Sequence, residues 1–372
     1  MSAEKFKHIP HPNPTPEAER RKLLAEGNFG KVFSDHMFLM DYDPEKGWHD
    51  GRLEARRPFA LDPASLVLHY GQEIFEGMKA FKGPDGTVTV FRPEANGQRL
   101  AASARRLAMP EMPVETFVSA IDALVQKDSA WVPEAEGHSL YLRPFMIAHD
   151  AFLGVKPAER YLFAVIASPV GNYFAKPTVD VWVTERYTRA APGGTGEAKC
   201  GGNYAGGLVA QREAYSQKCD QVLFLDSTQG HFVEEMGGMN VMFVRKDGSV
   251  VTPPLDGTIL RGITRNSLLT LGRDMGLNMR EEPVDINELF EAAAAGDVVE
   301  AFACGTAAAV SPIGRLKRTP GEGDKAGRRT EAVFGDGATP GPVTMKLKKA
   351  LLDVQRGRVE DKHGWRHSIM VQ

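Results

Sequence analysis

A break containing prolines and a glycine in the middle of the chain most limits how this chain can fold. Residues 168–177 hold two prolines and a glycine, and they separate two halves with their own strand and helix patterns. With 372 residues, the chain is long enough for two hydrophobic cores. We therefore expect two domains joined by a loop, with these boundaries: 1–30 for an extended N-terminal arm, 31–168 for a small α+β domain, 169–178 for the interdomain loop and 179–372 for a large domain.

The first half combines short apolar runs with longer helical patterns. Helical spacing of apolar residues predicts helices over 96–107 and 117–127. This mixture indicates the α+β fold class, with a mixed sheet and a pair of helices. The expected strands are 32–33, 37–40, 87–91, 139–143 and 160–166.

The second half has the same mixed character. Asp285 is followed three residues later by Glu288, a capping box that predicts the start of a helix. A hairpin is expected to turn at residues 246–248. The other expected elements are strands at 179–184, 221–226, 231–234 and 298–303, and helices over 204–218, from residue 262 onward and over 344–356.

Charge and cysteine content exclude several classes of function. The formal net charge is -3, so there is no broad basic field for nucleic acid or an anionic membrane. The longest apolar stretch, 161–167, is far shorter than the ~20 residues that span a bilayer. The polar N-terminal residues lack the apolar core of a signal peptide. Three widely separated cysteines favour neither a disulfide framework nor a metal site, and they indicate a cytoplasmic protein.

Lys199 lies between two glycine-rich stretches, residues 193–196 and 201–202. Small residues on both sides allow a bulky planar ligand to approach the backbone. A solvated lysine in a flexible loop has the same local pattern. The spacing of Gly194 and Gly196 does not make a dinucleotide-binding motif, because no strand–glycine–helix unit with a later acidic residue surrounds it.

Three later segments carry groups that suit a charged ligand. Glu234 and Glu235 end a predicted strand just before small residues. Residues 260–265 begin a helix whose first N–H groups favour an anion, and residues 304–307 form a small-residue turn. Each segment alone is also explained by ordinary structure: a charged strand end, a common helix start and a tight turn.

Together these segments supply the parts that pyridoxal 5'-phosphate chemistry needs. A lysine must hold the aldehyde as an imine and later move the α-proton. A carboxylate must keep the pyridine nitrogen protonated, and a phosphate needs an arginine with N–H groups at a helix start. The order of these groups along the chain favours a pyridoxal-phosphate enzyme with Lys199 as its lysine.

The same segments resemble the fold-type IV aminotransferases, specifically the branched-chain amino acid aminotransferases. The similarity runs from about residue 29 to residue 310, and several ordered motifs of this length are hard to obtain by chance. The resemblance implies two domains with the cofactor at their interface. Its most specific pieces are residues 68–80, 91–96, 141–144, 199–204 and 235–240.

This resemblance also implies roles for individual residues. Lys199 would form the imine, Glu235 would pair with the pyridine nitrogen, and Tyr204 would hydrogen-bond the phenolic oxygen. The phosphate would be held by Arg99, the backbone of Ile263 and Thr264, and Thr306. Without the resemblance, Arg99 would be an ordinary solvated helix arginine.

The substrates implied are leucine, isoleucine or valine with 2-oxoglutarate. A branched aliphatic side chain needs an apolar, aromatic-walled pocket, although most aromatic residues are ordinary core. In the family, Tyr141 and Arg143 lie near the substrate carboxylates. The full implied substrate set is Phe29, Tyr70, Phe75, Tyr141, Arg143, Tyr173, Gly238 and Ala307.

Three further points concern the match in detail. Some eukaryotic members have a Cys-x-x-Cys pair where this chain has Ala308 and Ser311, so redox regulation of that kind is not expected. Gly238 replaces a hydroxyl residue found in some relatives. Residues 148–156 match a loop that reaches the neighbouring subunit's active site, which implies a homodimer.

Two other functions are compatible with parts of this pattern. A D-amino acid aminotransferase or an aminodeoxychorismate lyase has the same fold, but the matches at 70–80 and 141–144 argue against both. A binding or scaffold protein without catalysis belongs to another class. The joint presence of Lys199, Tyr204, Glu235 and Arg99 argues against it.

Overall fold

The computed structural model describes residues 6–26, 30–171, 176–320 and 327–370, and it divides into two compact units. The first unit comprises Met1–Tyr173, Ala198–Gly201 and Asp353–Gln372, and the second comprises Phe174–Glu197 and Gly202–Leu352. The expected boundaries differ from this division in two places, because the Lys199 segment and the C-terminal segment belong to the first unit. The expected loop at 169–178 lies partly outside the described residues.

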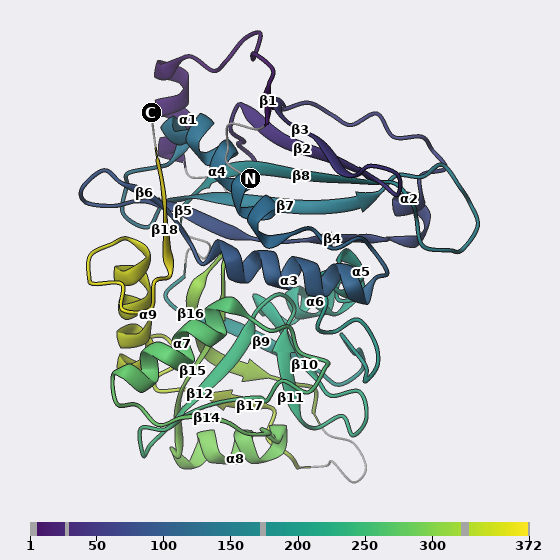
Figure 1. The fold of residues 1–372 in the computed structure, drawn as a ribbon. Coiled ribbons are helices and arrows are strands. Elements are labelled where there is room, and N and C mark those ends of the chain that lie inside the picture. Colours follow the sequence, from purple (N-terminus) through teal and green to yellow (C-terminus); the bar gives the residue numbers. More distant parts are fainter. Residues whose placement is uncertain (1–5, 27–29, 172–175, 321–326, 371–372) are drawn as a thin grey trace. The chain divides into compact units, whose positions relative to one another are not determined.

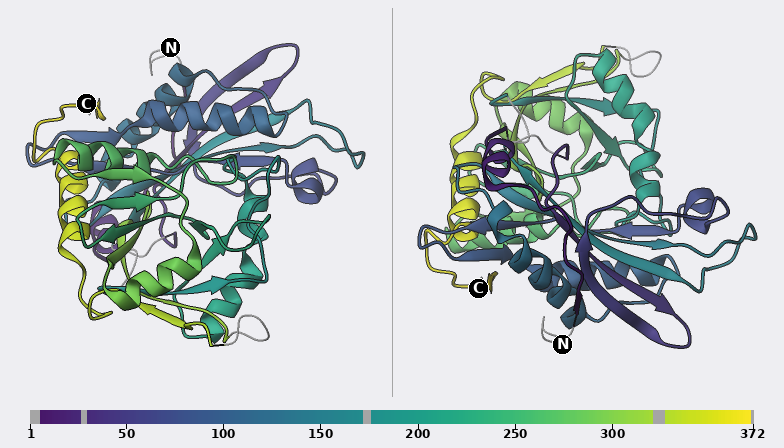
Figure 2. Two further views of the ribbon diagram at one scale, coloured as in Figure 1. Left: turned by 90° about the horizontal axis from the view of Figure 1, so that it is seen from below. Right: turned by 90° about the horizontal axis from the view of Figure 1, so that it is seen from above.

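The first unit is built on a mainly antiparallel sheet (Figure 1). Its strand order is β1 (Lys7–His8), β3 (Gly47–Ala55), β2 (His36–Asp43), β8 (Tyr161–Val170), β7 (Ser139–Ala148), β5 (Met78–Lys82), β6 (Val88–Phe91) and β18 (Arg366–Ile369), and β4 (Glu73–Phe75) also pairs with β7. The hairpin of β2 and β3 extends beyond the rest of this sheet (Figure 2).

Two helices cover one face of this sheet. These helices, α3 (Pro93–Arg106) and α4 (Val114–Lys127), lie side by side (Figure 1). Leu100 of α3 is buried in one core with sheet residues and with Phe117 and Leu124, which lie seven residues apart on one face of α4. Burying each such side chain contributes about 1.5–3 kcal/mol. The helices predicted over 96–107 and 117–127 are therefore confirmed.

Two expectations for the first unit are wrong. Residues 32–33 form no strand in the described chain, and the carbonyl of Val32 instead accepts a hydrogen bond from Ser168 Oγ at 2.6 Å. The N-terminal arm is not extended throughout, because α1 (Glu17–Glu26) is a helix. The prolines stop at residue 16, and the Glu, Ala, Arg, Lys and Leu residues that follow have high helix propensity. The short helices α2 (Leu66–Tyr70) and η2 (Ser129–Trp131) complete the unit as described.

The second unit contains a mixed sheet, which agrees with the predicted fold class. Three of its pairings are parallel: β9 with β10, β9 with β16, and β13 with β14. The strand order is β11 (Val233–Met236), β10 (Gln221–Leu225), β9 (Val179–Thr184), β16 (Ala309–Lys317), β15 (Val298–Gly305), β12 (Asn240–Arg245), β13 (Val250–Thr252) and β14 (Met279–Glu281), and β17 (Glu331–Val333) pairs with β16.

The helices of the second unit mostly begin where the sequence predicts. Asp285 caps α8 (Ile286–Ala295) by accepting from the N–H groups of Asn287 and Glu288 at 2.7 and 3.2 Å. The helix predicted over 204–218 is instead broken into α5 (Gly201–Ala205) and α6 (Leu208–Ser216). Glycines at 206 and 207 explain the break, because glycine is a poor helix former. The other helices are α7 (Ile263–Asp274) and α9 (Pro342–Gln355).

Within the described ranges, no helix combines the length and the apolar character needed to cross a membrane.

Candidate active site

The backbone on both sides of Lys199 is held by the first unit. The N–H of Lys199 donates to Ser103 Oγ on α3 at 2.9 Å, and its carbonyl accepts from the N–H of Phe75 at 2.9 Å. Two residues later, the N–H of Gly201 donates to the Glu73 carboxylate. Two residues of β4 and one of α3 therefore hold a glycine-rich loop that has little intrinsic order.

The side chain of Lys199 lies over an aromatic ring. Its Nζ is 4.8 Å from the ring centroid of Phe75, and the guanidinium of Arg143 lies 4.8 Å from the same centroid. Both are favourable cation–π distances. The structure thus brings together Lys199, Phe75 and Arg143, three residues of the predicted site.

Arg143 also contacts Tyr141, another residue of the predicted substrate set. Its Nη2 donates to Tyr141 Oη at 3.0 Å. The Nε of Arg143 is buried and has no hydrogen-bond partner among the described residues. Gly77 permits this arrangement, because a Cβ there would overlap Tyr141 Oη. A buried guanidinium N–H of this kind suits a carboxylate of a ligand.

Arg99, the predicted phosphate ligand, makes a bidentate ion pair with Glu76. Its Nε and Nη2 donate to the two Glu76 oxygens at 2.7 and 2.8 Å. The arginine side chain is only 10% exposed, so it is not a solvated helix arginine.

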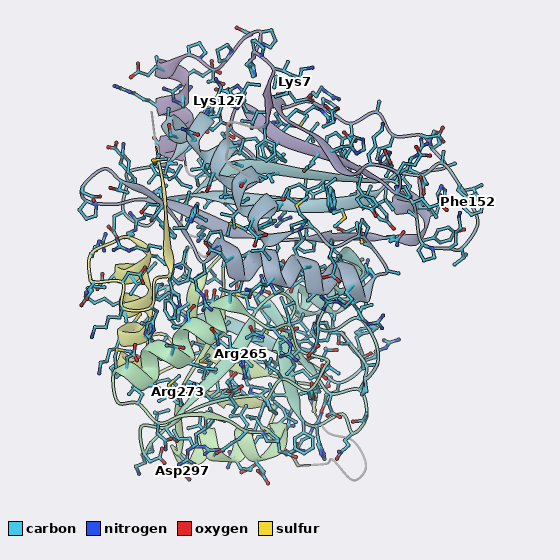
Figure 3. The ribbon with its side chains drawn as sticks, in the orientation of Figure 1. Lys7, Lys127, Phe152, Arg265, Arg273 and Asp297 are labelled. Carbon is cyan, nitrogen blue, oxygen red and sulfur yellow. The ribbon has the colours of Figure 1, made fainter. Side chains whose placement is uncertain are left out.

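Tyr70 lies on a different, exposed part of the first unit. Its hydroxyl donates to the carbonyl of Leu153, and its side chain is 45% exposed. Phe152, Leu153 and Val155 of the same loop are exposed large apolar residues, and Phe152 stands at the outer end of the loop (Figure 3). Two predicted pocket residues, Phe29 and Tyr173, lie outside the described residues.

Glu235 is the central charged group of the second unit. It lies on β11 with its side chain 4% exposed, and Arg189 Nη2 approaches its Oε1 at 2.7 Å. Asn240 Nδ2 donates to Oε2 at 3.0 Å, and the N–H of Leu260 donates to Oε1 at 3.2 Å. A cation and two N–H donors stabilise a negative charge on this buried carboxylate.

The neighbouring Glu234 has the opposite character. Burial raises the pKa of Glu234, and its Oε2 has no hydrogen-bond partner among the described residues. Of the two adjacent acids that the sequence offers, Glu235 is therefore the one surrounded by a cation and two N–H donors.

Asn240 connects the two predicted phosphate-binding segments. On β12 it pairs opposite Cys304, two residues before Thr306. Its side chain fills the space where a Cβ of Gly262 would lie, directly before Ile263 and Thr264 at the start of α7. The start of α7 and the turn after β15 are thereby brought together. The first N–H groups of a helix have no intrahelical acceptor and favour an anion.

Tyr204 and Gly238 also lie close to each other in the second unit. A Cβ built on Gly238 would be 3.6 Å from Tyr204 Cε1, an ordinary contact distance. The predicted set is therefore distributed between the units as follows: Lys199, Arg99, Tyr70, Phe75, Tyr141 and Arg143 lie in the first, and Tyr204, Glu235, Gly238, Ile263, Thr264, Thr306 and Ala307 in the second.

Sequence reasoning missed the residues that hold these groups in place. Glu76 lies inside the matched motif 68–80 and Asn240 inside 235–240, so the motifs held a signal for both. Arg189 and Ser103 lie outside every motif, and only the folded chain reveals their contacts with Glu235 and Lys199.

Comparison with known proteins gives consistent matches over most of the chain. The family described as amino-transferase class IV matches residues 73–316. A Streptomyces coelicolor protein named probable branched-chain-amino-acid aminotransferase is 50% identical over 364 residues, covering 97% of each chain.

Two solved structures share the fold. Escherichia coli branched-chain amino acid aminotransferase has a TM-score of 0.74 at 26% identity, covering 91% of this chain and 99% of that one. Another branched-chain amino acid aminotransferase, solved in complex with N-(5'-phosphopyridoxyl)-L-glutamate, has a TM-score of 0.69 at 25% identity, covering 89% and 97%. These likenesses confirm the predicted fold class.

Proposed function

The chain belongs to the class IV aminotransferases, in the branched-chain amino acid aminotransferase family, and we propose that it transfers the amino group of L-leucine, L-isoleucine or L-valine reversibly to 2-oxoglutarate. The products are glutamate and a branched 2-oxo acid. No feature of the described residues favours one of the alternative reactions of the same fold over this one.

The buried, charge-paired Glu235 carries the cofactor part of this proposal, and the relative that is 50% identical supports the reaction. Arg189, Asn240 and the Leu260 N–H direct a positive charge and two hydrogen bonds at this buried carboxylate, which stabilises its charged form. Such a group suits the protonated ring nitrogen of a pyridine cofactor, which needs a fixed negative partner. The small residues Gly237 and Gly238 directly after β11 leave room for a planar ligand.

The groups present fit pyridoxal 5'-phosphate. Lys199 offers the amine, Glu235 the ring-nitrogen partner and Tyr204 a phenol. The phosphate would be held by Arg99, by the N–H groups of Ile263 and Thr264 at the start of α7, and by Thr306. When bound, this cofactor supplies the electron sink that allows a proton to leave the substrate Cα. The relative whose structure contains N-(5'-phosphopyridoxyl)-L-glutamate supports the choice of cofactor.

The chain's own residues then bind the substrate and move its proton. Nζ of Lys199 is the base that takes the proton from the substrate Cα. The guanidinium of Arg143, whose Nε is buried, and the hydroxyl of Tyr141 bind a substrate carboxylate, aided by the backbone at Gly238 and Ala307.

The aliphatic side chain of the substrate would contact an aromatic wall. Phe75 lies beside Lys199 and forms part of this wall. Phe29 and Tyr173 are proposed for the same pocket on the strength of the family resemblance. Tyr70, which is hydrogen-bonded to the exposed loop at Leu153, is proposed for the pocket of the neighbouring subunit.

We further propose that the enzyme is a cytoplasmic homodimer. The exposed apolar loop of Phe152, Leu153 and Val155, to which Tyr70 is bonded, would be buried by the second copy. The three cysteines are free and buried, which suits a reducing compartment.

The test is the formation of glutamate from leucine and 2-oxoglutarate by the purified protein with pyridoxal phosphate. We expect glutamate in a time-dependent assay, activity also with isoleucine and valine, and none with Lys199→Ala. Activity with D-alanine alone would instead identify a D-amino acid aminotransferase and overturn the proposal.

A further inference from the structure

Glu76 is a buried carboxylate to which the proposed reaction assigns no role. It directly follows β4, and its side chain is 0% exposed. Arg99 Nε donates to its Oε1 at 2.7 Å. Its Oε2 accepts from Arg99 Nη2 at 2.8 Å, from Asn96 Nδ2 at 2.7 Å and from the N–H of Gly77 at 3.1 Å. Both carboxylate oxygens therefore accept hydrogen bonds.

The geometry of this contact determines how Arg99 is oriented. Asn96 and Arg99 are three residues apart on α3 and so lie on the same face of the helix. The carboxylate accepts hydrogen bonds from both nitrogens of the Nε–Nη2 edge of the planar guanidinium. A bidentate contact of this kind is the most directional form of an arginine–carboxylate pair. The Nη1 end of the guanidinium is thereby directed away from Glu76.

Arg99 and Lys199 both act electrostatically on Glu76. Burial opposes ionisation of Glu76, but the charge and hydrogen bonds of Arg99, followed by the charge of Lys199, hold the pKa of Glu76 below its ordinary value. A carboxylate held in its charged form in this way offers both of its oxygens as acceptors to Arg99.

We propose that Glu76 is a positioning residue that locks the guanidinium of Arg99 in the orientation that binds the phosphate of the cofactor. This inference rests on the proposed pyridoxal-phosphate function. Without Glu76, Arg99 keeps its charge but loses its fixed orientation. We therefore expect the loss of binding affinity to be confined to ligands that carry the phosphate.

The experiment compares two ligands that differ only in the phosphate. The full-length apo-protein is titrated with pyridoxal phosphate and with pyridoxal, and binding is followed by visible absorbance. Glu76→Gln places an amide N–H₂ among donors that need an acceptor. We expect it to weaken pyridoxal phosphate binding by about tenfold or more, and pyridoxal binding by less than about twofold.

Two further variants separate positioning from a general effect on folding. Glu76→Asp keeps the charge on a shorter side chain, and we expect it to recover part of the affinity for pyridoxal phosphate. Glu54→Gln is the matched control, because Glu54 is also a buried carboxylate of the first unit, paired with Arg57 at 2.8 Å. We expect Glu54→Gln to leave the ratio of the two affinities unchanged.

The outcomes distinguish failure of the role proposed for Glu76 from failure of the proposed function. Equal weakening for both ligands, or no weakening for either, overturns the role of Glu76. If Glu76→Gln does not fold, Glu76→Asp must show a smaller but still selective loss for pyridoxal phosphate, and an unselective loss overturns the role. A wild-type protein that binds neither ligand refutes the proposed function itself.

Discussion

The ion pair between Arg189 and Glu235 leads to a prediction about stability. Both side chains are about 95% buried, at 5% and 4% exposed, and their charged atoms are 2.7 Å apart. Arg189→Leu leaves the carboxylate buried without its cation, a change that costs about 3–5 kcal/mol in comparable buried pairs. Asn240 and the Leu260 N–H still donate to Glu235, but the carbonyls of Gly196 and Thr258 also lose the hydrogen bonds from Arg189, so we expect about 3 kcal/mol or more.

The measurement is the free energy of unfolding in urea for the wild-type protein and the variants. Arg261→Leu is the matched control in the same unit. Its pair with Glu197 has a similar distance, 3.0 Å, but Arg261 is 64% exposed, so we expect a loss below about 1 kcal/mol. Replacing both Arg189 and Glu235 by leucine removes the unpaired charge, so this double variant should regain much of the stability lost by Arg189→Leu alone.

Two results would refute this reasoning. The first is that Arg189→Leu loses no more stability than Arg261→Leu does. The second is that the double variant is less stable than Arg189→Leu alone. Either result would mean that Glu235 does not depend on Arg189 for its charge.

Two further predictions concern the first unit. Gly77→Ala places a Cβ where Tyr141 Oη lies, so the hydroxyl must move away from Arg143. In steady-state kinetics we expect the KM for 2-oxoglutarate to rise by about tenfold, with a smaller change in kcat. An unchanged KM would contradict the assigned contact. The hydrogen bond to Asp122 raises the pKa of His367 above its ordinary 6.5, so its stabilisation is complete below that value and is lost as pH rises through the folded pKa. His367→Gln should therefore lower the thermal midpoint more at about pH 6 than at about pH 9, and equal losses at the two pH values would count against this pair.

Local sequence patterns predicted most of the regular elements. The strand at 179–184 coincides with β9, because a run of apolar residues of strand length has few alternatives once it is buried. The two glycines that divide the helix expected over 204–218 were visible in the sequence, but the helical period outweighed them. The pairing of β18 with β6 depends on tertiary packing between segments about 275 residues apart, for which no local pattern exists.

For the candidate site, too, the sequence predicted the residues with recognisable chemistry but not their tertiary contacts. Glycine-rich motifs and charged residues indicated Lys199, Glu235 and Arg99, because their chemistry is visible in the residue types. The groups that hold them, Arg189 and Glu76, approach from 46 and 23 residues away along the chain, and only the fold brings them into contact. Electrostatic partnership of this kind is a property of the packed chain.

The most direct test of the account is borohydride reduction of the purified protein with bound pyridoxal phosphate, followed by peptide mapping. We predict loss of the visible absorbance band and one phosphopyridoxyl label per chain, on Lys199. A label on another lysine, or no label with the band unchanged, would contradict the assignment of Lys199 and with it the proposed reaction.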